Sequence, residues 1–158
     1  MIEVIKVIAS LFLAVTVHEG GHAGAVALSG GRVTSFKPYP TNGFFGYTEY
    51  SGLPQNAQKI FYLSGVSASM LSTIPIRELE KKYPDETFFR YWDFWATVDL
   101  PLHSLLALVN DKSDLAKFSD KTGVPVVALV GLSFLWATQK TNKNVLFTGT
   151  KIFFVKEF

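Results

Sequence analysis

Apolar residues fall in four blocks that polar segments separate, and this pattern predicts the main elements of the chain. The blocks span residues 7–29, 60–76, 88–109 and 124–138. In the first block, the only ionisable side chains are those of His18, Glu19 and His22. About 20 apolar residues in a helix are enough to cross a bilayer. We therefore predict four helices that are transmembrane spans, of which the fourth is short.

The segment after the first block predicts a small β-region. The paired glycines at 30–31 supply the left-handed turn in which many helices end. Residues 33–36 and 44–50 are rich in β-branched and aromatic side chains, and two prolines and the Asn-Gly pair at 42–43 lie between them. This composition is typical of two short strands joined by turns.

The remaining polar segments predict loops and a strand-forming tail. Residues 77–86 contain seven charged side chains and a proline, so we expect a solvated loop there. Residues 110–123 form a second polar connection before the last block. The tail after Gln139 contains the sequences VLFTG and KIFFV, which favour an edge strand or an element at the membrane interface.

The composition indicates a single membrane-embedded domain. Of 158 residues, 48% are hydrophobic and 18% are charged, and the mean hydropathy is +0.23. Average soluble domains contain about 25% charged residues. The sequence thus predicts one domain over residues 1–158. Its predicted class is an α-helical, multi-pass integral membrane protein with about four transmembrane helices and a small β-hairpin region after the first of them.

Charge and cysteine content narrow the chemistry. The chain has no cysteine, which excludes a disulfide scaffold, a thiolate zinc site, an iron–sulfur cluster and a cysteine nucleophile. Its net charge of +2 is spread along the chain without a basic run, so we expect no nucleic-acid partner. Any metal ion must therefore be held by histidine and carboxylate side chains.

His18, Glu19 and His22 form the HExxH pattern, with Gly20 and Gly21 between them. In a helix, the two imidazoles project from one face about one turn apart, so that both can bind a single zinc ion. The Glu19 carboxylate points beside the metal, where it can take a proton from the zinc-bound water and pass it to a leaving amine. Glycine is unfavourable inside a helix by roughly 1 kcal/mol, so two of them predict a close approach by another element.

A polar helix contact without a metal is the alternative explanation of this pattern. Each ionisable residue in a membrane span costs about 2–3 kcal/mol or more, and three of them within five positions argue for a function. Ser10 and Thr16 are the only polar side chains between residues 7 and 17. The helix is thus apolar almost all round, and the zinc site is expected inside the membrane.

Together these features resemble the site-2 protease family of intramembrane zinc metalloproteases. That family combines an apolar HExxH helix, a β-region after a Gly-Gly helix end, and a small-residue second helix with a glycine motif, for which residues 63–66 are a loose counterpart. The resemblance implies that the third helix region supplies an aspartate as the third zinc ligand. It also implies substrates that are membrane-embedded peptides or proteins.

Four side chains compete for the role of third ligand: Asp99, His103, Asp111 and Asp114. The chain lacks the family's common Asn-x-x-Pro…Asp-Gly pattern, but Asp114 lies in a Lys-Ser-Asp-Leu sequence that resembles divergent Ser-Asp versions. A carboxylate is favoured over His103, because its charge partly offsets that of zinc in a low-dielectric site. The resemblance therefore favours Asp114, followed by Asp111. Asp99 and His103 share a helix face, where either can reach the metal or the two can bond to each other beside it.

The leading functional prediction is a zinc metalloendopeptidase with one zinc ion per chain, held by His18, His22 and Asp114, and with Glu19 as general base. Its predicted partners are membrane-embedded substrates and the lipid bilayer, and β-addition to the strands at 33–50 would hold an extended substrate. The alternative is a non-catalytic membrane protein of the same fold that acts as a binding or regulatory partner. A membrane di-iron hydroxylase is excluded, because it needs about eight histidines and the chain has three.

Overall fold

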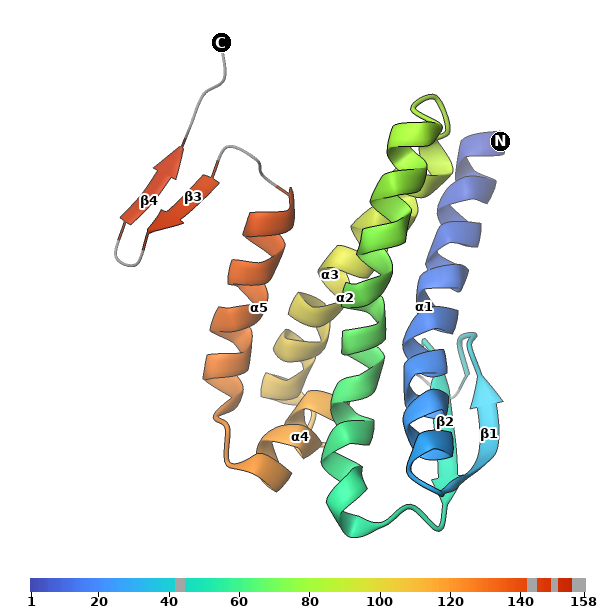
Figure 1. The fold of residues 1–158 in the computed structure, drawn as a ribbon, viewed down its shortest axis with the longest axis vertical. Helices are drawn as coiled ribbons and strands as arrows, with labels where there is room; N and C mark the ends of the chain where they lie inside the picture. Colours follow the sequence, from blue (N-terminus) through green and yellow to red (C-terminus); the bar gives the residue numbers. More distant parts are fainter. Residues whose placement is uncertain (42–44, 142–144, 149–150, 155–158) are drawn as a thin grey trace.

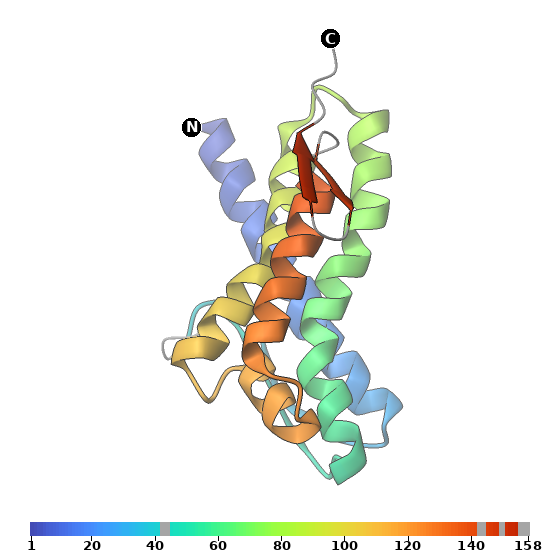
Figure 2. The ribbon, with the colours of Figure 1, turned by 90° about the vertical axis from the view of Figure 1, so that its left-hand side faces the viewer.

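The computed structural model describes residues 1–41, 45–141, 145–148 and 151–154. Its elements are α1 (Ile2–Leu28), β1 (Arg32–Lys37), β2 (Tyr47–Ser51), the 3₁₀ turn η1 (Gln55–Ala57), α2 (Gln58–Lys82), α3 (Thr87–Val109), α4 (Asp114–Thr122), α5 (Val126–Thr141), β3 (Val145–Thr148) and β4 (Lys151–Phe154). The long helices α1, α2 and α3 pack against one another, and α5 packs against α3 (Figure 1). A second view shows α1 inclined to α2 and α3 (Figure 2). Each apolar block thus forms a helix, as predicted.

Those helices are not membrane spans. Within the described ranges, no helix has both the length and the apolar character that crossing a bilayer requires. The prediction of an α-helical, multi-pass integral membrane protein with about four transmembrane helices is therefore wrong. Polar side chains interrupt the longer helices: α1 contains Lys6 and the HExxH residues, and α2 and α3 each contain charged turns. Helix α5 has 16 residues, fewer than the roughly 20 that a span needs.

The end of α1 agrees with the turn predicted at the paired glycines. Gly30 has a left-handed backbone conformation with φ of +76°, and Gly31 donates its N–H to the carbonyl of Val26 at 2.9 Å. This bond satisfies one of the carbonyls that a helix end leaves without a partner inside the helix. The chain then turns directly into β1.

Polar contacts join the N-terminal turns of α1 to the start of α3. Lys6 Nζ lies 2.8 Å from Glu86 Oε1 and 3.4 Å from Glu3 Oε1. The Thr87 hydroxyl donates to Glu3 Oε2 at 2.8 Å. Glu86 also caps α3, since its carboxylate accepts the backbone N–H of Phe88 at 3.0 Å. These contacts explain why α1 begins before the apolar block does.

The two short strands predicted after α1 are confirmed as an antiparallel hairpin of β1 and β2. Val33 pairs with Tyr50 and Phe36 with Thr48. The hairpin lies beside the C-terminal half of α1 (Figure 1). Strand β2 begins at residue 47, later than the predicted start at 44, and the turn expected at 42–43 lies outside the described residues together with Phe44.

Most of the segment at 77–86, which we expected to be a loop, is helical. Helix α2 continues to Lys82, so the connection to α3 covers only residues 83–86. Arg77 donates through Nε and Nη2 to the carboxylate of Asp93 on α3, each bond being 3.0 Å long. Arg, Glu, Leu and Lys are strong helix formers. The charges at 77–82 therefore belong to a polar helix end, and the loop prediction is wrong there.

The polar connection at 110–123 contains the short helix α4. Ser113 caps it, because its hydroxyl accepts the N–H of Ala116 at 3.3 Å, and Gly123 ends it with φ of +74°. Leu115 is fully buried in an apolar cluster with Val66 of α2 and Ala107 of α3. The burial of Leu115 anchors α4 to the helices and fixes the direction of the neighbouring Asp114 side chain.

The strand character predicted for the tail is confirmed. Strands β3 and β4 pair with each other antiparallel, from Val145 opposite Phe154 to Thr148 opposite Lys151. The tail therefore forms a hairpin of its own. It does not add an edge strand to the hairpin of β1 and β2.

Candidate metal centre

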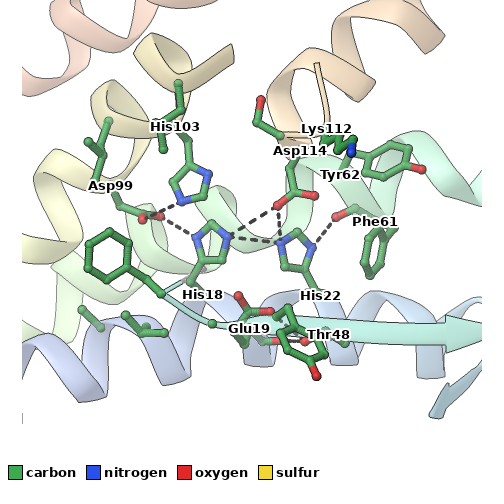
Figure 3. Close-up of a pocket in the computed structure, with 18 of the residues that line it drawn as sticks. His18, Glu19, His22, Thr48, Phe61, Tyr62, Asp99, His103, Lys112 and Asp114 are labelled. Atoms are coloured by element: carbon green, nitrogen blue, oxygen red, sulfur yellow. Dashed lines mark hydrogen bonds and ion pairs between the residues drawn. The ribbon is translucent and has the colours of Figure 1, made fainter. Parts of the chain in front are cut away.

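The HExxH residues lie on the side of α1 that faces the other helices. The exposed fractions of His18, Glu19 and His22 are 4%, 6% and 2%. Figure 3 shows both imidazoles pointing away from α1, toward α3 and α4, with Asp114 approaching them from α4. Because buried ionisable groups are costly unless they are paired, each of these side chains needs a partner.

Three ligand atoms from these side chains converge on one point. His22 Nε2 lies 3.1 Å from His18 Nε2 and 3.1 Å from Asp114 Oδ2. His18 Nε2 lies 3.9 Å from the same oxygen of Asp114. Ligands at about 2.0–2.1 Å from a tetrahedral zinc ion are about 3.3 Å from one another. The three separations lie on both sides of that value, so this group has the donor types and the dimensions of a zinc site.

The other ring nitrogen of each histidine is held by an acceptor. His18 Nδ1 lies 2.8 Å from Asp99 Oδ2, and His22 Nδ1 lies 2.7 Å from the carbonyl oxygen of Phe61. A carboxylate and a carbonyl can only accept, which assigns the proton to Nδ1 in both rings. In the neutral form of each ring, Nε2 then presents its lone pair to the shared point. Metal-binding histidines are oriented by hydrogen bonds of this kind.

The charges around the point of convergence favour a cation. Burial lowers the pKa of His18, but the charge of Asp99 and the hydrogen bond to Asp114 outweigh it and raise that pKa to about 10. Burial raises the pKa of Asp114, but hydrogen bonds to His18 and His22 outweigh it and hold that pKa well below its usual range. Both shifts stabilise positive charge between the acceptor atoms, where lone pairs and a carboxylate oxygen otherwise repel one another.

Gly65 of α2 leaves the space that an ion needs. A Cβ atom at this position would lie 2.5 Å from the Nε2 atom of His18 and 2.5 Å from that of His22. Any other residue would therefore place its side chain against both nitrogen atoms. Gly65 lies within the small-residue motif at 63–66, and its surroundings give that motif a physical reason. The residues present thus fit a bound metal ion.

Gly21 allows the close approach of α2 to α1. A Cβ atom here would lie 2.7 Å from Cβ of Ala68 and would collide with the backbone oxygen of Ser64. This is the close approach that the glycine pair predicts. At Gly20 the prediction is wrong, because no atom of another described element lies within 4 Å of a Cβ placed there. The proximity of the two helices at Gly21 brings the Phe61 carbonyl within reach of His22.

Glu19 is held beside the ligands by β2. The Thr48 hydroxyl donates to Glu19 Oε2 at 2.8 Å and lies 3.1 Å from the backbone oxygen of Glu19. A Cβ at Gly46, just before β2, would lie 3.0 Å from Glu19 Cγ and 2.7 Å from Val15 Cγ1, so only glycine lets the start of this strand approach so closely. Burial raises the pKa of Glu19, and the charge of His18 lowers it in part. A carboxyl group with a raised pKa is suited to accepting and returning a proton near neutral pH.

The four candidates for the third ligand occupy different places. Asp114 contacts the Nε2 atoms of both histidines. Asp99 contacts the opposite nitrogen of His18, and His103 Nε2 lies 3.5 Å from Asp99 Oδ1. Asp111 is exposed and belongs to none of the potential metal-binding groups in the described part of the chain. Of the four, Asp114 has the position that a third ligand requires.

Two members of the site were missed from the sequence. Thr48 and the Phe61 carbonyl lie 29 and 39 residues from the side chains that they contact. Neither position carries a local signal, because one is a common strand residue and the other acts through its backbone. Only the packing of β2 and α2 against α1 shows their roles.

A cavity of about 980 Å³ opens beside this centre. Its walls come from α1, from residues 45–50 at the start of the second strand, and from α2, α3 and α4. Ligand-binding pockets commonly have volumes of about 300–1,000 Å³. The cavity is therefore large enough for several residues of a peptide.

Comparisons with protein-family models, with curated proteins and with solved structures give no match. The relation to the site-2 protease family thus stays a prediction from the motifs.

Proposed function

We propose that this protein is a zinc-dependent peptide hydrolase in which His18, His22 and Asp114 hold one zinc ion and Glu19 is the general base. The observation that carries the proposal is the convergence of three acceptor atoms, two pairs of which are 3.1 Å apart, beside a buried carboxyl group. Three protein ligands leave one tetrahedral position open, which is the arrangement of catalytic zinc sites.

The ligand set supports zinc as the metal. Two imidazoles and one carboxylate suit this ion, and the chain offers no thiolate. A zinc ion in such a site lowers the pKa of bound water and polarises a substrate carbonyl. Asp99 and the Phe61 carbonyl hold the two imidazoles in the orientation that binding needs, so the ligands are arranged in advance.

Glu19 moves the proton in the proposed reaction. Its Oε2 atom is engaged by the Thr48 hydroxyl, which leaves Oε1 to take a proton from the attacking water. The same carboxyl group then returns the proton to the amine that leaves when the peptide bond breaks. Burial raises the pKa of Glu19 and so favours the protonated carboxyl group that exists between these two proton transfers.

The cavity supports an extended peptide as substrate. Strand β2 contributes its side chains to the cavity wall and pairs with β1 along one edge. A peptide that adds to the strand would expose its backbone carbonyls to the metal centre, since β-addition holds the main chain straight. Membrane-embedded substrates and a bilayer partner stay predictions from the family resemblance.

Metal analysis of purified protein tests the proposal. We expect about one zinc ion per chain in the wild type and none in the His18→Ala/His22→Ala variant. Protein that binds no transition metal when supplied with zinc, or a double variant that keeps it, would contradict the proposed site.

Two alanine substitutions, one at Gly65 and one at Gly24, give a sharper test of where the ion binds. Gly65→Ala places a Cβ atom 2.5 Å from both Nε2 atoms and should abolish zinc binding while leaving the helical circular dichroism unchanged. The matched control is Gly24→Ala in α1, where the described residues outside α1 place no atom within 4 Å of the new Cβ, and it should bind zinc like the wild type. Equal zinc contents in the two variants would place the ion elsewhere.

A further inference from the structure

His103 lies behind the zinc ligand His18 and does not contact the point where the ligand atoms converge. Its ring stacks on that of His18, with ring centroids 4.4 Å apart and an angle of 20° between the planes. Its Nε2 atom lies 3.5 Å from Oδ1 of Asp99, one turn earlier on α3. Asp99 uses its other oxygen, Oδ2, to hold Nδ1 of His18 at 2.8 Å. Figure 3 shows Asp99 beside both histidines, with dashed lines from its carboxylate to each of them.

The surroundings of His103 fix which of its nitrogens carries the proton. In the described part of the chain, its Nδ1 atom is buried and has no hydrogen-bond partner. A proton on Nδ1 would leave a buried donor unsatisfied and would turn the Nε2 lone pair toward the Asp99 carboxylate. With the proton on Nε2, the N–H group lies on the side of the carboxylate, and the unpartnered Nδ1 atom carries a lone pair instead of a buried N–H group. His103 therefore carries its N–H group 3.5 Å from Asp99 Oδ1, while His18 donates to Oδ2 at 2.8 Å.

We propose that His103 is a positioning residue for the zinc ligand His18. It restrains Asp99 through the contact at Oδ1 and restrains the plane of the His18 ring by stacking on it. The Nε2 lone pair of His18 is thereby kept in line with the other two ligand atoms. Residues that orient a metal ligand in this way affect metal affinity without touching the metal. This inference rests on the proposed zinc site.

A competing possibility is that His103 is itself a ligand. His18, Asp99 and His103 offer ligand atoms that lie within 4.8 Å of one another. A metal at that group would have to bind His18 through Nδ1, which instead makes a 2.8 Å hydrogen bond to Asp99. The same imidazole would then have to bridge two ions. The observed hydrogen bond favours the positioning role. The number of metal ions that the wild type binds distinguishes this role from that of a ligand.

The test compares zinc affinities, measured by competition with a chelator, for wild type and five variants. His103→Phe keeps a stacked ring but removes the N–H, and should weaken zinc binding about tenfold, the lower end of the effect typical of such residues. His103→Gln keeps an N–H donor near Asp99 and should recover most of the affinity. Leu105→Phe is the matched control on α3, because its side chain is 43% exposed and does not line the cavity. It should bind zinc within about twofold of wild type.

A double variant shows whether His103 acts through Asp99. Asp99→Asn alone should weaken zinc binding by up to about 100-fold. If His103 works through that carboxylate, Asp99→Asn/His103→Phe should bind zinc within about twofold of Asp99→Asn, because the two effects are not independent. The visible absorption of the cobalt-substituted protein should change in His103→Phe but not in Leu105→Phe, since it reports the arrangement of the ligands.

The outcomes separate this inference from the proposed function. Wild type that binds no zinc defeats both. Wild type that binds one zinc ion no more tightly than His103→Phe, or an additive double variant, overturns the positioning role alone. Two bound ions in the wild type, with one lost in His103→Phe and His103→Gln, would make His103 a ligand and also overturn it.

Discussion

Three carboxyl groups share the candidate site, and their surroundings give them different protonation behaviour. Burial opposes ionisation of Asp99 and Asp114, but the neighbouring histidines outweigh it and lower both pKa values. For Glu19, burial is the dominant cause and raises the pKa. Environments that separate the pKa values of neighbouring carboxyl groups assign them separate tasks. The two aspartates stay anionic, and Glu19 is the group suited to exchange a proton.

Glu19→Gln tests this division of roles. The amide keeps the shape of the side chain but cannot accept a proton, so peptide hydrolysis should fall by about 10² to 10⁴. Zinc content should stay at the wild-type value. Glu78→Gln, on the exposed end of α2, is the control and should keep full activity. Activity of Glu19→Gln within a few-fold of wild type would support the non-catalytic alternative.

At this scale, the sequence predicts the residues whose spacing is local. His18, Glu19 and His22 fall on one helix face because four residues make about one turn. The resemblance of its neighbouring residues to the family pattern predicts Asp114, and the structure brings this carboxylate within 3.1 Å of His22. Thr48 and the Phe61 carbonyl could not be predicted, because their contacts depend on how separate elements pack.

Where α1 and α2 cross, two adjacent glycines have opposite environments. A Cβ at Gly21 would meet Ala68 and the Ser64 backbone, whereas one at Gly20 would meet no neighbouring element within 4 Å in the part of the chain that the structure describes. The crossing thus depends on a single missing methyl group. Gly20→Ala and Gly21→Ala therefore make the same chemical change one residue apart, and only the second adds a methyl group at the contact with α2.

Gly21→Ala should destabilise the protein by about 1–3 kcal/mol, the usual effect of overpacking a close contact. Gly20→Ala should stabilise it by about 0.5–1 kcal/mol, because alanine favours a helix and no neighbour is displaced. Urea unfolding in the presence of a chelator checks both signs without a contribution from metal binding. Equal effects of the two substitutions would contradict the described packing of α2 on α1.

The contacts between α1 and the start of α3 predict a dependence of stability on pH. The hydrogen bond to Thr87 lowers the pKa of Glu3, and the hydrogen bond to Lys6 lowers that of Glu86. A lowered carboxyl pKa adds stability above the ordinary value of 4.5, and that stability is lost as pH falls through the folded-state pKa. The contribution is therefore present at pH 7 and absent in strong acid.

Lys6→Met should lower the melting temperature by about 1–2 °C at pH 7, as expected for an exposed ion pair. The difference from wild type should close in strong acid, below the lowered folded-state pKa values of both carboxyl groups. Lys81→Met is the control, because its Glu78 partner lies one turn away on the same exposed helix end. Thermal unfolding at the two pH values measures the effect, and a difference that persists in acid would contradict it.

At the scale of elements, hydrophobic blocks predicted the helices but not their limits or their surroundings. Residues 77–82 are charged and still helical, because Arg77 bonds to Asp93 on α3. Helix α4 was missed because its single buried Leu115 leaves no apolar block to detect. The length of the blocks predicts membrane spans. That prediction is wrong, because the longer helices contain ionisable residues and α5 is short.

In the whole molecule, the proposed metal centre would join α1 to α4. His18 and His22 lie on α1, and Asp114 lies on α4, which packs against α2 and α3. A bound ion is thus a link between elements that are far apart in the chain. Ligand binding to the folded state alone adds stability, about 2.7 kcal/mol when the free ligand is at 100 times its dissociation constant.

Removal of zinc by a chelator should therefore lower the melting temperature by about 5–10 °C at that zinc concentration. The effect should reverse when zinc is added back. The His18→Ala/His22→Ala variant should melt at the same temperature with and without chelator. A chelator effect of equal size in that variant would show that the metal acts elsewhere.

The position of Asp114 at the first turn of α4 also bears on how the protein is made. During synthesis, residues 18 to 22 leave the ribosome long before residue 114 does, and the hairpin that holds Glu19 also precedes it. A nascent chain therefore has the proposed general base and two of the three proposed ligands without the third. If the proposed site is correct, hydrolytic activity begins only after residue 114 has left the ribosome. A nascent chain that ends before residue 114 would then be unable to cleave its neighbours.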